Sequence, residues 1–260
     1  MDHAAYTDIV AEQSARFLAV LRRADPDGVV PSTPAWTVAD LVWHLAEVQW
    51  FWGAIVSDLL EDVDALTEPD RPEGAALVDL LRRSSADLVG ALRERDPADT
   101  CWSWHEDGRS VGWVARRQAH EALIHRVDAE LAAGVPVSAA PAELAADGVD
   151  ELLRVMLKLP SWGTFTPDGC AVRVLADDTG NRWLVRFGRF TGTSPNTGTT
   201  YDDDTVEVVD AVSDEEVGTT VSGDAWDLDR WLWGRGPADP LRLGGDVSVA
   251  HRLRAIAEVE

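Results

Sequence analysis

The sequence predicts a helical domain followed by a small α+β domain, because two periodic patterns follow each other along the chain. Over the first 160 residues, apolar side chains recur about every 3.6 positions, as in amphipathic helices. After the stretch KLPSWGTFTPDG, short segments alternate apolar and polar residues and are rich in Val, which indicates strands. We therefore expect one domain over residues 1–160 and a second over residues 168–260.

Helices are expected throughout the first domain. The second of them begins after Thr37, whose spacing to Asp40 resembles a capping box. The helices are expected over residues 4–23, from Thr37 through SDLL, over about 73–94, from after Ser110 to Gly134, and over about 141–158. Four or five long amphipathic helices with connections of medium length favour an up-and-down bundle.

The second domain is expected to hold a hairpin, further strands and two helices. CAVRVLA (170–176) and NRWLVRF (181–187) flank a DDTG turn, which predicts the hairpin. TVEVVDA and VGTTVSG are further strand candidates, and DAWDLDRWLWGR and about 246–259 are expected to be helical. The polar stretch 191–204 is expected to be a surface loop.

Composition argues against several classes of function. The chain has 46 acidic and 23 basic side chains, a net charge of −23, so it is expected to repel nucleic acids and anionic membranes. No apolar run approaches the length of a membrane span, and the acidic N-terminus lacks the pattern of a signal peptide, so we expect a cytoplasmic protein. The two cysteines, Cys101 and Cys170, match neither a disulfide framework nor a zinc knuckle and are expected to be free thiols.

Three side chains on two predicted helices could form a metal site. Glu121 and His125 are four residues apart and therefore share one face of a helix. His44 lies in the second helix among apolar neighbours, so it faces or borders the core. If the two helices adjoin, the two imidazoles and the carboxylate form a common ligand set for Zn²⁺ or another divalent metal, with one position left open.

Spacing alone leaves other interpretations open. Glu121 and His125 could be an exposed helical pair, and His44 could be a hydrogen-bonded core histidine. His120 fits the proposed cluster poorly and is expected either to support the ligands or to lie at the surface. Asp128 could bind the free ring nitrogen of His125 or pair with an arginine instead.

Three stretches of the chain resemble the mycothiol-dependent maleylpyruvate isomerase family. They are VPSTPAWTVADLVWHLAEVQWFWGAIV, RRQAHEALIHRVDAE and VSGDAWDLDRWLWGRGPADPLRLGGD. They occur in the family's order and extend over both predicted domains. The resemblance implies a DinB-like four-helix bundle, followed by an α+β domain related to sterol-carrier folds. It also implies that His44, Glu121 and His125 bind the metal and that Arg235 contributes to catalysis.

The resemblance further implies an isomerase or S-transferase that uses a divalent metal, favoured as zinc, and mycothiol as thiol cosubstrate. In this hypothesis the thiolate attacks a small electrophile whose carboxylate pairs with Arg235. Closely spaced Trp43, Trp50, Phe51 and Trp52 are either core or a wall of the substrate pocket. The alternatives are a non-catalytic metal-binding or regulatory module and a metal-dependent hydrolase. A monomer or a small homo-oligomer is expected.

Overall fold

The chain divides into a helical unit, Met1–Ser138, and a second unit, Ala139–Glu260. The computed structural model describes residues 1–22, 24–209 and 217–257. The first unit is almost entirely helical, and the second combines helices with a mixed five-stranded sheet. The predicted class, a helical domain followed by an α+β domain, is therefore confirmed.

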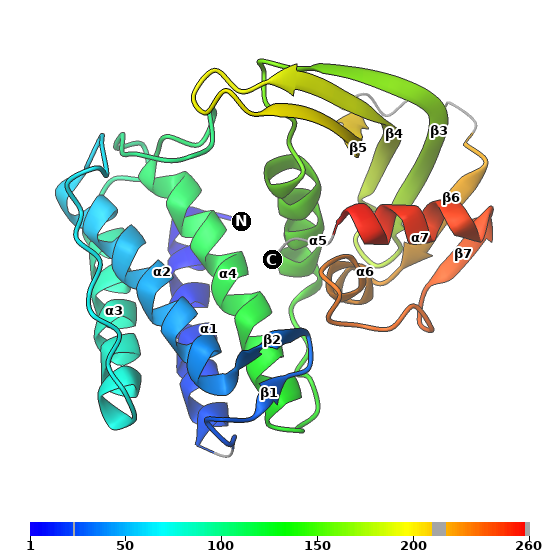
Figure 1. Cartoon of the computed structure of the whole chain (residues 1–260). Helices are drawn as coiled ribbons and strands as arrows, with labels where there is room; N and C mark the ends of the chain where they lie inside the picture. Colours follow the sequence, from blue (N-terminus) through cyan, green and yellow to red (C-terminus); the bar gives the residue numbers. More distant parts are fainter. Residues whose placement is uncertain (23, 210–216, 258–260) are drawn as a thin grey trace. The chain divides into compact units, whose positions relative to one another are not determined.

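Four long helices and one short hairpin build the first unit (Figure 1). Helix α1 packs on α4, and α2 packs on α3, while the hairpin lies against both α2 and α4. The elements are α1 (His3–Leu21), β1 (Val29–Val30), β2 (Thr33–Thr37), α2 (Val38–Asp58), α3 (Ala75–Glu94) and α4 (Val111–Ala132). The hairpin therefore places residues of its strands and of its turn next to both α2 and α4.

The helix boundaries follow from capping side chains. Thr37 accepts a hydrogen bond from the backbone of Asp40, and Asp40 accepts one from the backbone of Thr37, so the predicted capping box is present. These bonds to Thr37, followed by the one from Arg71, lower the pKa of Asp40 to about 2. Helix α4 begins at the cap Ser110, and Gly134 follows its end with φ of 63°, where glycine avoids the strain of a side chain.

Helix α4 is the most deeply buried element of the first unit. Every residue from Arg117 to Glu130 is buried, charged side chains included. Arg126 is only 1% exposed and donates hydrogen bonds to Gln13 and Glu130. A buried guanidinium with these partners avoids the large cost of an unpaired buried charge. Because α4 is buried all round, it has no polar face that would mark its functional residues in the sequence.

The aromatic residues of α2 belong mainly to the hydrophobic core. Trp52 is buried, and Phe51 and Trp102 pack edge-on or tilted against it with ring centroids 5.4–6.0 Å apart. Trp43 packs on a second cluster that contains Leu41 and Leu45. These contacts support the core interpretation of the aromatic run.

The second unit is built on one sheet with strand order β5-β4-β3-β6-β7. Strands β3 and β6 are parallel, and the other neighbouring pairs are antiparallel. The elements are α5 (Ala142–Glu151), a π-helical turn (Leu152–Met156), β3 (Thr164–Ala176), β4 (Arg182–Thr193), β5 (Thr200–Val209), β6 (Thr219–Gly223), α6 (Ala225–Leu232), β7 (Arg242–Gly245) and α7 (Val247–Ile256). The predicted hairpin of β3 and β4 is present. The final residues of TVEVVDA and of the last predicted helix lie outside the described residues.

The boundary between the two units differs from the one expected from the sequence. The division lies after Ser138, so α5 belongs to the second unit and not to a first domain that ends at residue 160. Helix α5 packs on α6, and the Trp183 indole donates a hydrogen bond to Asp150 of α5 at 3.0 Å. A helix that buries its apolar face against α6 therefore forms part of the α+β core.

The expected loop over residues 191–204 is largely a strand pair. Thr193 is paired with Thr200, and Thr191 with Asp202, so only the short connection between β4 and β5 is irregular. Polar residues are tolerated here because this end of the two strands is exposed. Arg189 of β4 also pairs with Asp202 and Asp204 across the ladder.

Among the described residues, none of the helices is both long enough and apolar enough to cross a bilayer.

Candidate metal centre

His44, Glu121 and His125 meet between α2 and α4. One ligand atom from each of the three side chains lies within 4.8 Å of the other two. The Nε2 atoms of both histidines lie 3.0 Å from the same carboxylate oxygen, Oε1 of Glu121. The imidazole centroids are 4.7 Å apart. The structure thus brings together all three residues that the sequence marked as candidate ligands.

His125 is fixed by a chain of hydrogen bonds that reaches the hairpin. Its Nδ1 atom lies 2.9 Å from Oδ2 of Asp128, which leaves Nε2 directed at the cluster. The hydroxyl of Ser32, in the turn between β1 and β2, donates to Oδ1 of Asp128 at 2.5 Å. A carboxylate on the second ring nitrogen is the usual means of orienting a metal-binding histidine. Asp128 therefore orients the imidazole of His125.

Glu121 is held from the opposite side by Arg117, one helical turn earlier. The guanidinium of Arg117 donates to Oε2, which leaves Oε1 for the two imidazoles. Burial alone would raise the pKa of Glu121, but Arg117 and His125 outweigh burial and hold it well below its usual value. Glu121 is therefore an ionised carboxylate at neutral pH.

The imidazole of His125 has a raised proton affinity in the absence of a cation. Burial acts to lower its pKa, but Glu121 and Asp128 together raise it to about 9. A cation at the cluster would therefore have to displace a proton from this ring near neutral pH.

Trp36 of β2 covers the two imidazoles. Its ring centroid lies 4.8 Å from that of His44 and 6.3 Å from that of His125. The side chain of His44 is 32% exposed, whereas those of Glu121 and His125 are 11% and 10% exposed. The cluster is therefore most accessible from the side of His44.

Three other residues considered in the sequence are not among the three donors. His120 is buried and packs edge-on against Tyr6, so its expected surface position was wrong. It is buried because α4 is surrounded on all sides. Cys101 is a buried free thiol whose pKa is raised to about 11 by burial and then by Asp99. Arg235, in the second unit, donates to the carbonyl of Trp233 at 2.6 Å.

Three residues of this centre were not predicted from the sequence. Arg117 could have been found, because it stands one helical turn before Glu121. Trp36 and Ser32 lie on the hairpin, and only folding brings them to the two helices. No spacing rule connects Ser32 with Asp128, which is 96 positions away.

The donor set fits a divalent cation. Two imidazole nitrogens and one carboxylate oxygen form a ligand set found in catalytic zinc sites, where a fourth position is open. Ca²⁺ and Mg²⁺ prefer oxygen ligands, so a set with two imidazole nitrogens suits them less well. The buried carboxylate, the oriented imidazole of His125 and the partly exposed His44 together match a site that binds a metal and leaves one side open.

The fold and the site define a class of two-domain proteins. The helical domain carries a candidate metal centre, and an α+β domain with a five-stranded sheet follows it. The model of the mycothiol maleylpyruvate isomerase N-terminal domain matches residues 8–130, and that of the corresponding C-terminal domain matches residues 143–252. The chain belongs to the mycothiol-dependent maleylpyruvate isomerase family.

Solved structures agree with this assignment at the level of the fold. The crystal structure of the mycothiol-dependent maleylpyruvate isomerase matches 94% of this chain and 93% of that chain, with a TM-score of 0.62 and 15% identity. A crystal structure of a His→Ala variant of that enzyme matches with the same coverage, a TM-score of 0.60 and 16% identity. No curated protein matches the chain. At such identities the structural likeness establishes the fold, and activity has to be argued from the site.

Proposed function

We propose that this chain is a metal-dependent, mycothiol-dependent enzyme that acts on a small electrophilic substrate as an isomerase or an S-transferase. Family membership supports the thiol, and the convergence of His44, Glu121 and His125 is the single observation that supports the metal. In this proposal the helical unit is a DinB-like four-helix bundle, and its three donors bind one divalent cation, with zinc favoured by the ligand types.

The cation, when bound, would stabilise the anionic sulfur of the cosubstrate and so favour thiolate near neutral pH. The chain's own residues would prepare the site for it. Asp128 keeps the His125 Nδ1 proton and directs Nε2 to the cluster, while Arg117 keeps Glu121 ionised. Trp36 would form one wall of the site beside the two imidazoles.

The reaction begins with attack of the mycothiol sulfur on an electrophilic carbon of the substrate. In an isomerase, addition to a conjugated double bond leaves a single bond that can rotate, and expulsion of the sulfur restores the double bond in the other geometry. In an S-transferase, the conjugate is released instead. Arg235 would pair with a substrate carboxylate through its two-pronged guanidinium. The protein supplies no nucleophile of its own in either reaction.

Thiol dependence is tested by the turnover of a maleyl-type conjugated acid with mycothiol, with glutathione and without thiol. Mycothiol is expected to give turnover well above the other two conditions. Equal rates in all three would reject thiol dependence. Product analysis by NMR separates the two reactions, since an isomer with full recovery of thiol identifies an isomerase and a thioether identifies a transferase.

A metal-dependent hydrolase and a non-catalytic metal-binding module are the alternatives. A hydrolase would act on its substrate without thiol, and a binding module would show no turnover with any thiol.

A further inference from the structure

Arg117 binds the same carboxylate that the two histidines of the candidate metal centre share. Oε1 of Glu121 lies 3.0 Å from Nε2 of His44 and 3.0 Å from Nε2 of His125. The other oxygen, Oε2, accepts a hydrogen bond from the guanidinium of Arg117. Arg117 and Glu121 are one helical turn apart on α4, so a single helix carries both side chains. The carboxylate therefore presents one oxygen to the cluster and the other to an arginine.

This division of the two oxygens sets the number of donor atoms that the cluster can offer a cation. A carboxylate can bind a cation through one oxygen or through both. With one oxygen, the carboxylate and the two imidazoles supply three donors, and a tetrahedral zinc ion keeps one position for an outside ligand. With both oxygens, the same three side chains supply four donors and fill a tetrahedral set. The partner of Oε2 thus decides whether the candidate site is open or closed.

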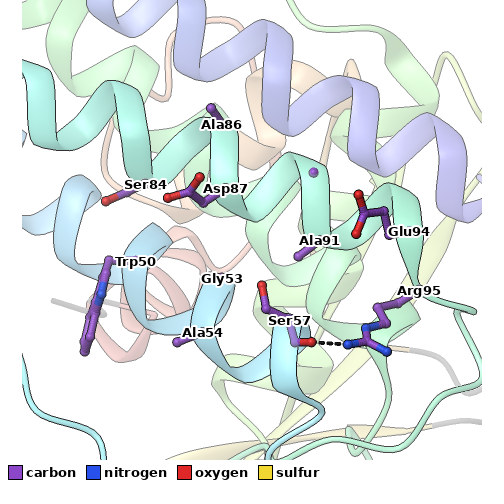
Figure 2. Close-up of a pocket in the computed structure, with 11 residues that line it drawn as sticks. Trp50, Gly53, Ala54, Ser57, Ser84, Ala86, Asp87, Ala91, Glu94 and Arg95 are labelled. Atoms are coloured by element: carbon purple, nitrogen blue, oxygen red, sulfur yellow. Dashed lines mark hydrogen bonds between the residues drawn. The ribbon is translucent and has the colours of Figure 1, made fainter.

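No further side chain of the described residues adds a donor to this cluster. The group of potential metal ligands consists of His44, Glu121 and His125. Figure 2 shows two exposed carboxylates, Asp87 and Glu94, on α3 beside a hollow, and the α2 residues that line this hollow face away from His44. These carboxylates therefore do not complete the site, and Oε2 of Glu121 is the fourth donor to be considered.

The ion pair between Arg117 and Glu121 is buried and therefore hard to separate. The two side chains are 9% and 11% exposed, so water has little access to either charge. Separation of a buried ion pair costs much more free energy than separation of an exposed one. A hydrogen bond between charged groups is also stronger than one between neutral groups. We therefore expect Oε2 to stay with Arg117 when a cation binds Oε1.

We infer that Arg117 is a positioning residue, which confines Glu121 to one coordinating oxygen and so keeps one position of the cation open to an outside ligand. This inference rests on the proposed function, in which the cation stabilises the sulfur of the cosubstrate. It adds a requirement for an arginine at this position, because the planar guanidinium holds a carboxylate oxygen in a fixed direction.

A crystal structure of the full-length protein loaded with zinc tests the inference without any substitution. Zinc is expected on Nε2 of both histidines and on Oε1 of Glu121, with Arg117 still bound to Oε2. Coordination by both oxygens of Glu121 would overturn the inference and leave the proposed metal site intact. Zinc absent from all three donors would instead contradict the proposed function, and the inference with it.

Two variants of Arg117 test its effect on the open position. Each protein is loaded with cobalt, whose visible spectrum reports the number of ligands, and is titrated with azide and with imidazole at pH 8. Neither probe is a thiol, so the result does not depend on mycothiol. Arg117→Met has no group to hold Oε2 and is expected to bind both probes about tenfold more weakly, as is usual for loss of a partner of a metal ligand. Arg117→Lys still donates to Oε2 and is expected to stay within about threefold of the wild type.

The control for these variants is Arg109→Met, at an exposed position before α4, which is expected to bind both probes as the wild type does. Unchanged binding of both probes in Arg117→Met would overturn the inference. Weaker binding of azide alone would also overturn it, because imidazole is mainly neutral at pH 8 and loss of a positive charge weakens only the anion. The zinc-bound structure needs no variant and decides the question if Arg117→Met does not fold.

Discussion

Nε2 of His44, on α2, lies 3.0 Å from Oε1 of Glu121, on α4, although the two residues are 77 positions apart in the chain. This contact joins two helices whose main packing partners are α3 and α1. The two imidazoles and the buried carboxylate direct their donor atoms at one volume. A divalent cation bound there could coordinate all three in place of the direct hydrogen bonds between them. The predictions below concern this arrangement and the charged groups around it.

Asp128→Asn is expected to weaken zinc binding. The amide is almost the same shape but has no charge, so it orients His125 less firmly and makes its ring a poorer ligand. Loss of such a partner typically costs roughly 10–100-fold in metal affinity. Ser32→Ala removes only the hydroxyl bound to Asp128 and is expected to have a smaller effect. Competition with a chromophoric chelator measures both affinities, and unchanged affinity in Asp128→Asn would contradict the orienting role.

Cys101→Ala is expected to retain thiol-dependent turnover within about twofold, given that the nucleophile comes from the cosubstrate. The pKa of the Cys101 thiol, about 11, keeps it protonated near neutral pH. The substitution shortens a buried side chain, so a small loss of thermal stability is expected as well. Comparison of kcat/KM for the two proteins at saturating mycothiol provides the measurement. A loss of a hundredfold or more with the fold retained would show that Cys101 takes part.

Asp229 of α6 is expected to make the protein less stable as pH rises. It is fully buried, and within the described residues neither carboxyl oxygen has a hydrogen-bond partner. Burial raises its pKa well above the usual 3.8, and the charges of Glu151 and Asp147 raise it further. Since the folded-state pKa lies above that of the unfolded chain, the stability contributed by the neutral acid is complete below pH 3.8. It is lost as pH rises toward the folded-state pKa.

Asp229→Asn cannot ionise and is expected to flatten this dependence, which for one proton is at most about 1.4 kcal/mol per pH unit. Urea unfolding at several pH values between 5 and 8 measures it. Asp239→Asn, an exposed position in the same unit, serves as the control and should keep the wild-type slope. An identical slope in Asp229→Asn would show that Asp229 does not cause the effect.

The sequence was sufficient to single out the three candidate donors, which the structure brings together, but not the residues around them. Glu121 and His125 are related by helical spacing, His44 was singled out by its place among apolar residues of the second helix, and the resemblance of three motifs to one family strengthened all three. Trp36 and Ser32 reach the cluster only through the packing of the β1–β2 hairpin on α2 and α4. The burial of His120 was missed for a related reason, since α4 carries both charged and apolar residues on every buried face.

The boundary between the units shows a different limit of sequence patterns. Residues 141–158 have the periodicity of an amphipathic helix, and periodicity does not tell which core receives the apolar face. That face packs on α6, which follows more than 70 positions later in the chain. The paired ends of β4 and β5 were misjudged as loop, because exposed strands tolerate the polar residues that are usual in loops.

Metal content tests the central claim most directly. The purified wild-type protein, loaded with zinc and freed of excess metal, is expected to hold one equivalent per chain by elemental mass spectrometry. His44→Ala and His125→Ala are expected to hold far less. His120→Ala, a histidine on α4 outside the cluster, is expected to keep the full equivalent. Zinc content in His44→Ala and His125→Ala equal to that of the wild type would contradict the account.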